Sequence, residues 1–185
     1  MRIVAGKHRG KTLLSPGDES IRPTSDRARE AIFSIVSSRI GPNLAGLRVL
    51  DLFAGTGALG LEALSRGAAS VVFVDTGSEA RGLIRDHIEA FGAGGVAKLL
   101  RRDATDLGPA GTMGPFNLVF LDPPYGKGLG EKALASLAAG KWLAPDAIIV
   151  LEEGIEAELK LPPGFIIELR RQYGAAAVRL LSYES

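Results

Sequence analysis

Hydrophobic positions recur with two different periods along this chain. In residues 24–40, apolar side chains return every three or four positions, a spacing typical of an amphipathic helix. Thr24 or Ser25 is suited to begin this helix, and Gly41 to end it. Residues 1–22 alternate only weakly and contain glycines and a proline, so we expect them to form a short hairpin or loop arm.

From residue 47 onward, short apolar runs alternate with glycine turns and amphipathic segments. This order predicts an α/β fold with a mostly parallel sheet that is covered by helices on both faces. The C-terminal segment holds two apolar runs with no room for a helix between them, so we expect an antiparallel hairpin at the sheet edge. The predicted strands are residues 47–53, 70–75, 96–103, 116–122 and 147–153, followed by the hairpin in 164–184.

Length and composition fit one ordinary globular domain with a short extension. The chain has 185 residues, of which 46% are apolar and 23% are charged. We expect residues 1–46 to form a basic arm and helix, and residues 47–185 to form the main domain. No apolar run is long enough to span a bilayer, and no secretory signal follows the basic N-terminus.

The rarity of certain side chains excludes several kinds of chemistry. Cysteine is absent, which removes disulfides, thiolate metal ligands and a cysteine nucleophile. With only two histidines in the chain, we expect no metal site. The lack of cysteine fits a reducing cytoplasm, where we expect the protein to work.

Charge is distributed unevenly, although the net charge is only +1. Residues 1–46 hold eight Lys or Arg and four acids, a balance of +4, and the remainder of the chain has a balance of −3. A basic front on a slightly acidic body indicates a polyanionic partner at one end. The alternative is a solvated charged face with no partner.

Acidic residues close four of the predicted strands. Asp51, Asp75, Asp103 and Asp122 each end an apolar run. One such acid could simply cap the following helix. Because the carboxyl ends of parallel strands meet at one edge, and ligands of such sheets bind there, four acids together favour a binding rim.

A glycine-rich loop follows the first of these strands. Gly55, Gly57 and Gly60 form a G-x-G-x-x-G pattern between a strand and a helix, and Asp75 could hold ribose hydroxyls. Two cofactors fit this pattern: a dinucleotide, with its pyrophosphate at the helix N-terminus, or S-adenosylmethionine, with its methionine part there. A tight turn that binds no ligand is the remaining interpretation.

Asp51 favours S-adenosylmethionine over a dinucleotide such as NAD. Its carboxylate would repel a pyrophosphate and attract a cationic amino group or sulfonium, by roughly 1–4 kcal/mol per contact in partly wet surroundings. Asp103 would then face the adenine amino group, and Leu52, Phe53 and Ala104 would supply apolar walls.

The fourth strand runs directly into Asp122, Pro123, Pro124 and Tyr125. The Asp122 carboxylate and the Pro123 carbonyl can each accept an N–H bond from an aromatic amine and aim its lone pair at a methyl donor. The two prolines fix the backbone, and Tyr125 offers a stacking face for a base, worth roughly 1–3 kcal/mol. The alternative is a strand end with a rigid turn.

Four blocks of this sequence resemble the RsmD family of bacterial 16S rRNA guanine-N2 methyltransferases. They are residues 2–11, 22–35, 49–68 and 120–125, so that with the tail the resemblance covers almost the whole chain. It implies a class I methyltransferase fold with a seven-stranded sheet, S-adenosylmethionine as donor, and 16S rRNA of the small ribosomal subunit as partner. We expect a monomer.

The resemblance also implies a role for individual residues, with Thr24 and Asp26 ordering the entrance helix. The catalytic loop would be Asp122, Pro123, Pro124 and Tyr125. The cofactor would contact Asp51, Phe53, Ala54, Gly55, Thr56, Gly57, Asp75, Thr76, Asp103, Ala104 and Asp122. The rRNA would contact Arg2, Lys7, Arg9, Lys11, Arg22, Thr24, Arg27 and Arg29.

Three alternatives to this function stay open. A DNA adenine-N6 or other RNA amine methyltransferase would use the same catalytic loop, whereas a pyrimidine C5 methyltransferase would need a cysteine. A non-catalytic rRNA-binding assembly factor could retain the fold, and an NAD oxidoreductase would share the glycine loop. The segment 173–178 is less polar than we expect of relatives, which concerns the tail and not the chemistry.

Overall fold

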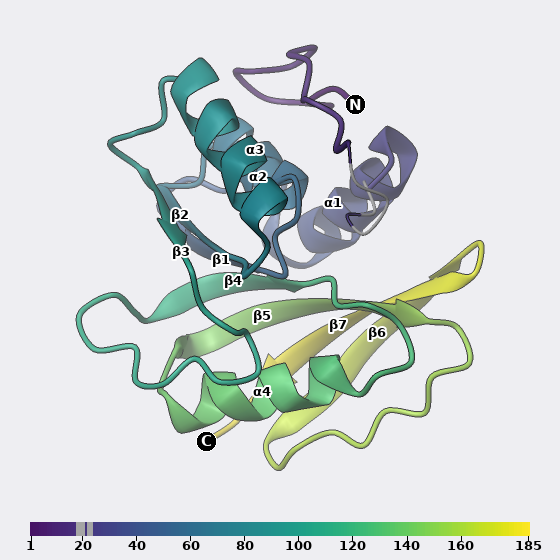
Figure 1. Cartoon of the computed structure of the whole chain (residues 1–185). Coiled ribbons are helices and arrows are strands. Elements are labelled where there is room, and N and C mark those ends of the chain that lie inside the picture. Colours follow the sequence, from purple (N-terminus) through teal and green to yellow (C-terminus); the bar gives the residue numbers. More distant parts are fainter. Residues whose placement is uncertain (18–20, 22–23) are drawn as a thin grey trace.

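The computed structural model describes residues 1–17, 21 and 24–185. One mixed sheet of seven strands forms its centre (Figure 1). The strands are β1 (Arg48–Leu52), β2 (Ser70–Val74), β3 (Ala97–Leu100), β4 (Phe116–Leu121), β5 (Leu143–Gly154), β6 (Phe165–Tyr173) and β7 (Ala176–Tyr183). The helices are α1 (Asp26–Ile40), α2 (Ala58–Ser65), α3 (Ser78–Ala90) and α4 (Leu129–Ala139).

The strands lie in the order β3-β2-β1-β4-β5-β7-β6. The first five strands of the chain pair in parallel, and β7 pairs antiparallel with both β5 and β6. The predicted class of fold is therefore confirmed, including the antiparallel hairpin at the sheet edge. The order reverses between β1 and β4, the point at which sheets of this type bind ligands.

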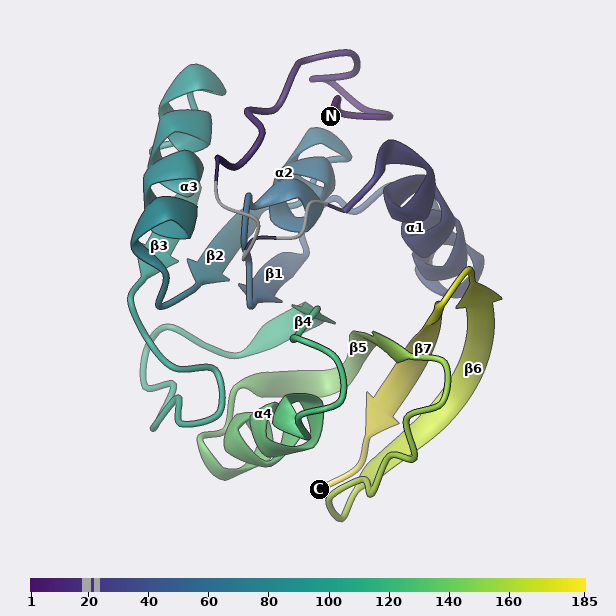
Figure 2. The same cartoon turned by 45° about the vertical axis from the view of Figure 1, so that its right-hand side comes forward.

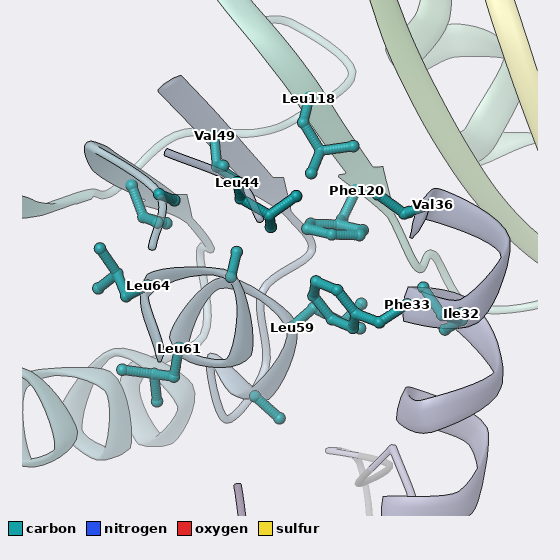
Figure 3. Packing of buried hydrophobic residues seen from close by; sticks show 14 of the residues in the cluster. Ile32, Phe33, Val36, Leu44, Val49, Leu59, Leu61, Leu64, Leu118 and Phe120 are labelled. Carbon is teal, nitrogen blue, oxygen red and sulfur yellow. The ribbon is translucent and has the colours of Figure 1, made fainter. Parts of the chain in front are cut away.

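Two hydrophobic clusters fill the two faces of the sheet. Along β4, Leu118 and Phe120 belong to the cluster under α1 and α2, and Val119 and Leu121 belong to the cluster under α4 (Figures 1 and 3). This alternation follows from the two-residue repeat of a strand, because neighbouring side chains point to opposite faces. Strands with apolar residues on both faces are expected in a sheet that helices cover on both sides.

The N-terminal arm, residues 1–17, shares the cluster under α1 and α2. Ile3 and Leu13 are buried there with Phe33 of α1, and an isolated bridge pairs Arg2 with Thr12. The arm lies beside α2 and α3 (Figure 2), where the Lys7 N–H donates to the Ser65 carbonyl. One continuous apolar core thus joins the arm to the sheet.

Two negative findings concern the described part of the chain. No helix in it combines the length and apolar character needed to cross a membrane. Within the same residues, no group of three or more His, Asp or Glu side chains is arranged to hold a metal ion.

Candidate active site

Three acids stand at the carboxyl edge of the sheet at two different depths. Asp51 in β1 is level with Phe73 and Phe120 in the neighbouring strands, whereas Asp75 and Asp122 come two residues later. Since a parallel strand rises about 3.3 Å per residue, Asp51 lies one pleat deeper. Its side chain is 1% exposed, and the other two are half-buried.

A cavity of about 640 Å³ opens at this edge. The loops after β1, β2, β3 and β4 form its walls, and Ile21 and Thr24 close it from the N-terminal side. Most residues that the sequence singled out line it: Asp51, Phe53, Ala54, Gly55, Thr56, Asp75, Thr76, Asp103, Asp122, Pro123, Pro124 and Tyr125. The glycine loop and the Asp-Pro-Pro-Tyr loop therefore share one cavity.

Asp51 combines a structural contact with an unusual electrostatic state. Its Oδ2 atom accepts the N–H of Gly60, in the first turn of α2, at 3.0 Å. Burial raises the pKa of its carboxyl well above the usual value, and the charges of Asp122 and Asp75 raise it further. A cation bound nearby would favour the ionised form of this carboxyl. Asp51 is therefore suited to bind a cationic ligand.

The loop between β1 and α2 turns through left-handed backbone conformations. Gly57, with φ +80°, directly precedes α2, and Phe53 adopts φ +55°, which is unfavourable for a residue with a side chain. Such strain persists only where the surroundings impose it, and here it directs the start of the loop into the cavity. Gly60 has a packing role, because a Cβ atom would lie 2.4 Å from the Phe73 ring.

Asp75 ties two loops together at the rim. Its Oδ2 atom accepts the Gly55 N–H at 2.9 Å, and its Oδ1 atom accepts the Gly77 N–H at 2.8 Å. Each carboxylate oxygen has a further lone pair, so Asp75 can still accept from a ligand hydroxyl.

The residues predicted to lie around the adenine are separated by the structure. Asp103 lines the cavity and accepts bonds from the Thr105 hydroxyl and N–H, which lower the pKa of its carboxyl. Leu52, in contrast, is 0% exposed in the cluster under α4, so its prediction as a cavity wall is wrong. Ala104 is 4% exposed and packs in the same cluster, so its prediction as a cavity wall is wrong as well. The chain turns its side chain inward immediately after the rim. Gly57 also lies outside the cavity lining, where its backbone begins α2.

The Asp-Pro-Pro-Tyr loop is held from two directions. The Thr24 hydroxyl lies 3.4 Å from Asp122 Oδ2 on one side. On the other, the Tyr125 hydroxyl donates to Glu152 Oε1 at 2.6 Å, and the Gly126 N–H donates to Glu153 Oε1 at 3.1 Å. Residues before α1 and at the end of β5 thus fix the loop that follows β4.

Arg29 was predicted to contact RNA, and the structure shows that this is wrong. Its side chain is 0% exposed, and its Nε atom pairs with the buried carboxylate of Glu62 at 3.2 Å. Its other nitrogens donate to the Thr24 carbonyl, to Asp26 and to the Arg2 carbonyl. A buried guanidinium needs such partners, and this one joins the arm, α1 and α2. Asp26 begins α1, as expected, and Ser25 caps it.

The other basic residues of the front differ in exposure. Arg2, Lys7, Arg9 and Arg27 are exposed. Lys11 is half-buried, with its ammonium 4.5 Å from the centre of the Phe91 ring. Arg22 lies outside the residues that the structure describes.

Two groups of residues were missed from the sequence. His87 is buried in α3 and accepts the Leu14 N–H at 2.8 Å, while its Nδ1 atom bonds the Thr56 carbonyl at 2.9 Å, so it links the arm to the cavity. Glu152 and Glu153 hold the Asp-Pro-Pro-Tyr loop. The sequence does contain an indication of Glu152 and Glu153, because both acids follow an apolar run, as Asp51 does.

Known proteins resemble this chain over its full length. A model of the family described as "Conserved hypothetical protein 95" matches residues 1–182. The protein named "Ribosomal RNA small subunit methyltransferase D" of Escherichia coli is 34% identical over 100% of this chain and 91% of its own length. The "Putative rRNA methyltransferase YlbH" of Bacillus subtilis is 34% identical over 97% of both chains.

Solved structures agree with these relationships. The structure titled "Putative methyltransferase yhhF from Escherichia coli" has a TM-score of 0.82 at 33% identity, covering 100% of this chain and 98% of that one. A putative methylase of Haemophilus influenzae has a TM-score of 0.80 at 29% identity, covering 100% and 98%. The fold is that of a class I methyltransferase. Within this class, the chain belongs to the RsmD family.

Proposed function

We propose that this protein transfers a methyl group from S-adenosylmethionine to the exocyclic N2 of a guanine in 16S rRNA. The observation that carries the proposal is that the glycine loop, Asp51 and the Asp-Pro-Pro-Tyr loop open into one cavity. The name of the E. coli relative, a small subunit rRNA methyltransferase, supports this choice of substrate.

The donor side of the cavity fits S-adenosylmethionine. Among the residues that the structure describes, no cation pairs with the buried carboxylate of Asp51, so the ammonium of a methionine moiety would complete it. Asp75 and Asp103 offer acceptors for ribose hydroxyls and the adenine amino group. When bound, S-adenosylmethionine supplies an electrophilic methyl group on a positively charged sulfur.

The acceptor side would orient the amine that receives the methyl group. Asp122 accepts one N–H of the guanine amino group, and the Pro123 carbonyl accepts the other, which directs the nitrogen lone pair into the cavity. Positive charge that develops on this nitrogen is stabilised by the Asp122 carboxylate. Tyr125 stacks on the base, and the prolines hold both acceptors still.

The exposed cations Arg2, Lys7, Arg9 and Arg27 would bind rRNA phosphates. The small arm supplies little surface for reading an extended sequence. We therefore infer that an assembled or partly assembled small subunit presents the guanine, since folded RNA is recognised largely by shape.

Methyl transfer from radiolabelled S-adenosylmethionine tests the proposal directly. Small subunits from a strain that lacks the modification are incubated with the protein, and the methylated nucleoside is identified by mass after digestion. We expect N2-methylguanosine at one position of 16S rRNA. N6-methyladenosine would favour an adenine methyltransferase, and subunit binding without transfer would favour an assembly factor. Thermal stabilisation by NAD, with none by S-adenosylhomocysteine, would contradict the donor assignment.

A further inference from the structure

Glu152 of β5 makes a contact that the proposed chemistry does not yet use. Its Oε1 atom accepts the Tyr125 hydroxyl at 2.6 Å. Its Oε2 atom is buried and has no hydrogen-bond partner among the residues that the structure describes. A buried, unpartnered carboxylate oxygen costs stability, so a residue that keeps one calls for a functional explanation.

The strand register places Glu152 beside the candidate active site. Leu121 of β4 pairs with Leu151 of β5, so Asp122 and Glu152 are the next residues of two adjacent parallel strands. Phe120 and Val150 pair two positions before these acids and belong to the cluster under α1 and α2. Because side chains alternate along a strand, Asp122 and Glu152 continue this face of the sheet.

The end of β5 also lies close to the ring of Tyr125. Gly154 lies beside the base of the ring, because a Cβ atom there would be 3.7 Å from Tyr125 Cδ2, while Glu152 holds the hydroxyl at its tip. Glu153 has a different role, because its Oε1 atom accepts the N–H groups of Gly126 and Gly154. One acid therefore holds a side chain of the loop, and the next holds its backbone.

We propose that Glu152 is a positioning residue that fixes the Tyr125 ring as the platform for the acceptor base. The proposal rests on the proposed function, since it assumes that a base stacks on this ring. A tyrosine free to rotate about its Cα–Cβ bond must be ordered each time a base binds. One already held at its hydroxyl presents its face in advance, which favours a correctly oriented acceptor.

Four variants test this role. In Glu152→Leu we expect kcat/KM for the small subunit to fall about 10-fold, the effect of losing one good hydrogen bond. Most of the loss should lie in KM, with the affinity for S-adenosylhomocysteine unchanged. Glu152→Gln keeps a hydrogen bond to the tyrosine and should restore activity to within about 3-fold of wild type. Tyr125→Phe should match Glu152→Leu, and exposed Glu156→Gln is the control.

The double variant Tyr125→Phe with Glu152→Leu separates positioning from general support. If Glu152 acts through the tyrosine hydroxyl, the double variant loses no more activity than either single change. Additive losses would overturn the proposal. The melting temperature of Glu152→Leu should change little, because loss of the hydrogen bond to the Tyr125 hydroxyl is offset by removal of a buried unpartnered oxygen. A lowered melting temperature with unchanged kcat/KM would show a structural role only.

A measurement without turnover distinguishes this inference from the proposed function. Three-bond couplings in protein labelled at its three tyrosines should report a single χ1 rotamer for Tyr125 in wild type and averaging in Glu152→Leu. If both proteins show the same averaging, Glu152 does not position the ring. If the couplings behave as expected but wild type methylates no small subunit, the proposed function fails and the positioning role stands.

Discussion

The two halves of the cavity are built in different ways. The donor half, which comprises the loops after β1 and β2, is held by bonds between residues close in sequence: Gly60 N–H to Asp51 across 9 positions, and Gly55 N–H to Asp75 across 20. The acceptor half, residues 122–125, is held by Thr24 across 98 positions and by Glu152 across 27. The donor half also has a more distant support, since His87 bonds the Thr56 carbonyl across 31 positions. Its two carboxylates are nevertheless held within neighbouring βα units, whereas residues 122–125 are held from other parts of the fold.

The kind of contact differs as well. Backbone N–H groups are the donors to Asp51 and Asp75, so most side-chain changes in the glycine loop leave those donors in place. Thr24 and Tyr125 reach their acidic partners through side chains, which a single substitution removes. Substitutions far from the cavity should therefore disturb the acceptor half more than the donor half.

The largest effect on stability is expected from the ion network that positions Thr24. Arg29→Met removes one of the two arginines that pair with the fully buried carboxylate of Glu62, and Arg66 remains at 3.0 Å, so the expected cost is that of a lost charged hydrogen bond, about 1.5–3 kcal/mol. Exposed Arg27→Met on the same helix should change the free energy of unfolding by less than about 0.5 kcal/mol. Urea unfolding of both variants measures the difference. Equal midpoints would mean that the buried network does not anchor this side of the cavity.

A smaller effect is expected in the donor half. Asp51→Asn should weaken binding of S-adenosylmethionine by about 10- to 100-fold, the value of one partly buried charge contact. Since burial raises the pKa of Asp51, affinity in wild type should increase with pH as the carboxyl ionises, and the variant should lack this dependence. Calorimetric titrations over a pH series measure both, with exposed Asp106→Asn as the control. Parallel pH profiles for wild type and Asp51→Asn would exclude Asp51 as the partner of the cation.

The link between the arm and the donor half should depend on pH. Burial lowers the pKa of His87, so the unfolded chain binds the proton more tightly than the folded one does. The His87 contribution to the free energy of unfolding is thus complete above about pH 6.5 and is lost as the pH falls toward the lowered pKa. Urea unfolding should show wild type losing its advantage over His87→Gln as the pH decreases. A difference that does not change with pH would contradict the neutral, bridging imidazole.

The smallest effects are expected from single cations of the arm. Arg9→Ala should reduce the salt dependence of small-subunit binding by roughly 0.7–0.9 in the slope of log K against log salt, the value of one phosphate contact. Exposed Lys160→Ala, in the loop before β6, should leave the slope unchanged. Filter binding over a salt series measures the slopes, and identical slopes for wild type and Arg9→Ala would remove Arg9 from the interface.

The fold was predictable because its signals are local. Each buried strand is an apolar run, such as the one ending at Asp51, and each crossover helix follows a glycine turn. Parallel pairing follows from that alternation, and the hairpin of β6 and β7 follows from the short spacing of its strands. The sequence pattern did not predict that the arm would enter the main core, because burial of Ile3 depends on contacts with α1.

Prediction of the site was incomplete in both halves. The errors were Arg29, Leu52 and Ala104, whose side chains are buried, and the omissions were His87 and Glu152. Composition marks an arginine near a basic arm as a phosphate contact. Arg29 lies three positions before Ile32, and this helical spacing places both residues on the buried face of α1. Ala104 directly follows the rim residue Asp103, yet its side chain lies in the core. A residue next to a cavity residue in the sequence therefore need not line the cavity.

The most direct test of the account is to separate the two halves with Asp122→Asn. We predict that the variant binds S-adenosylmethionine with nearly wild-type affinity in calorimetry. Its single-turnover rate of methyl transfer to small subunits should fall about 10²- to 10³-fold, as expected for the loss of one preorganised electrostatic group. A rate within a few-fold of wild type would contradict the role given to the Asp122 carboxylate, and an equal loss of donor affinity and rate would contradict the division of the cavity.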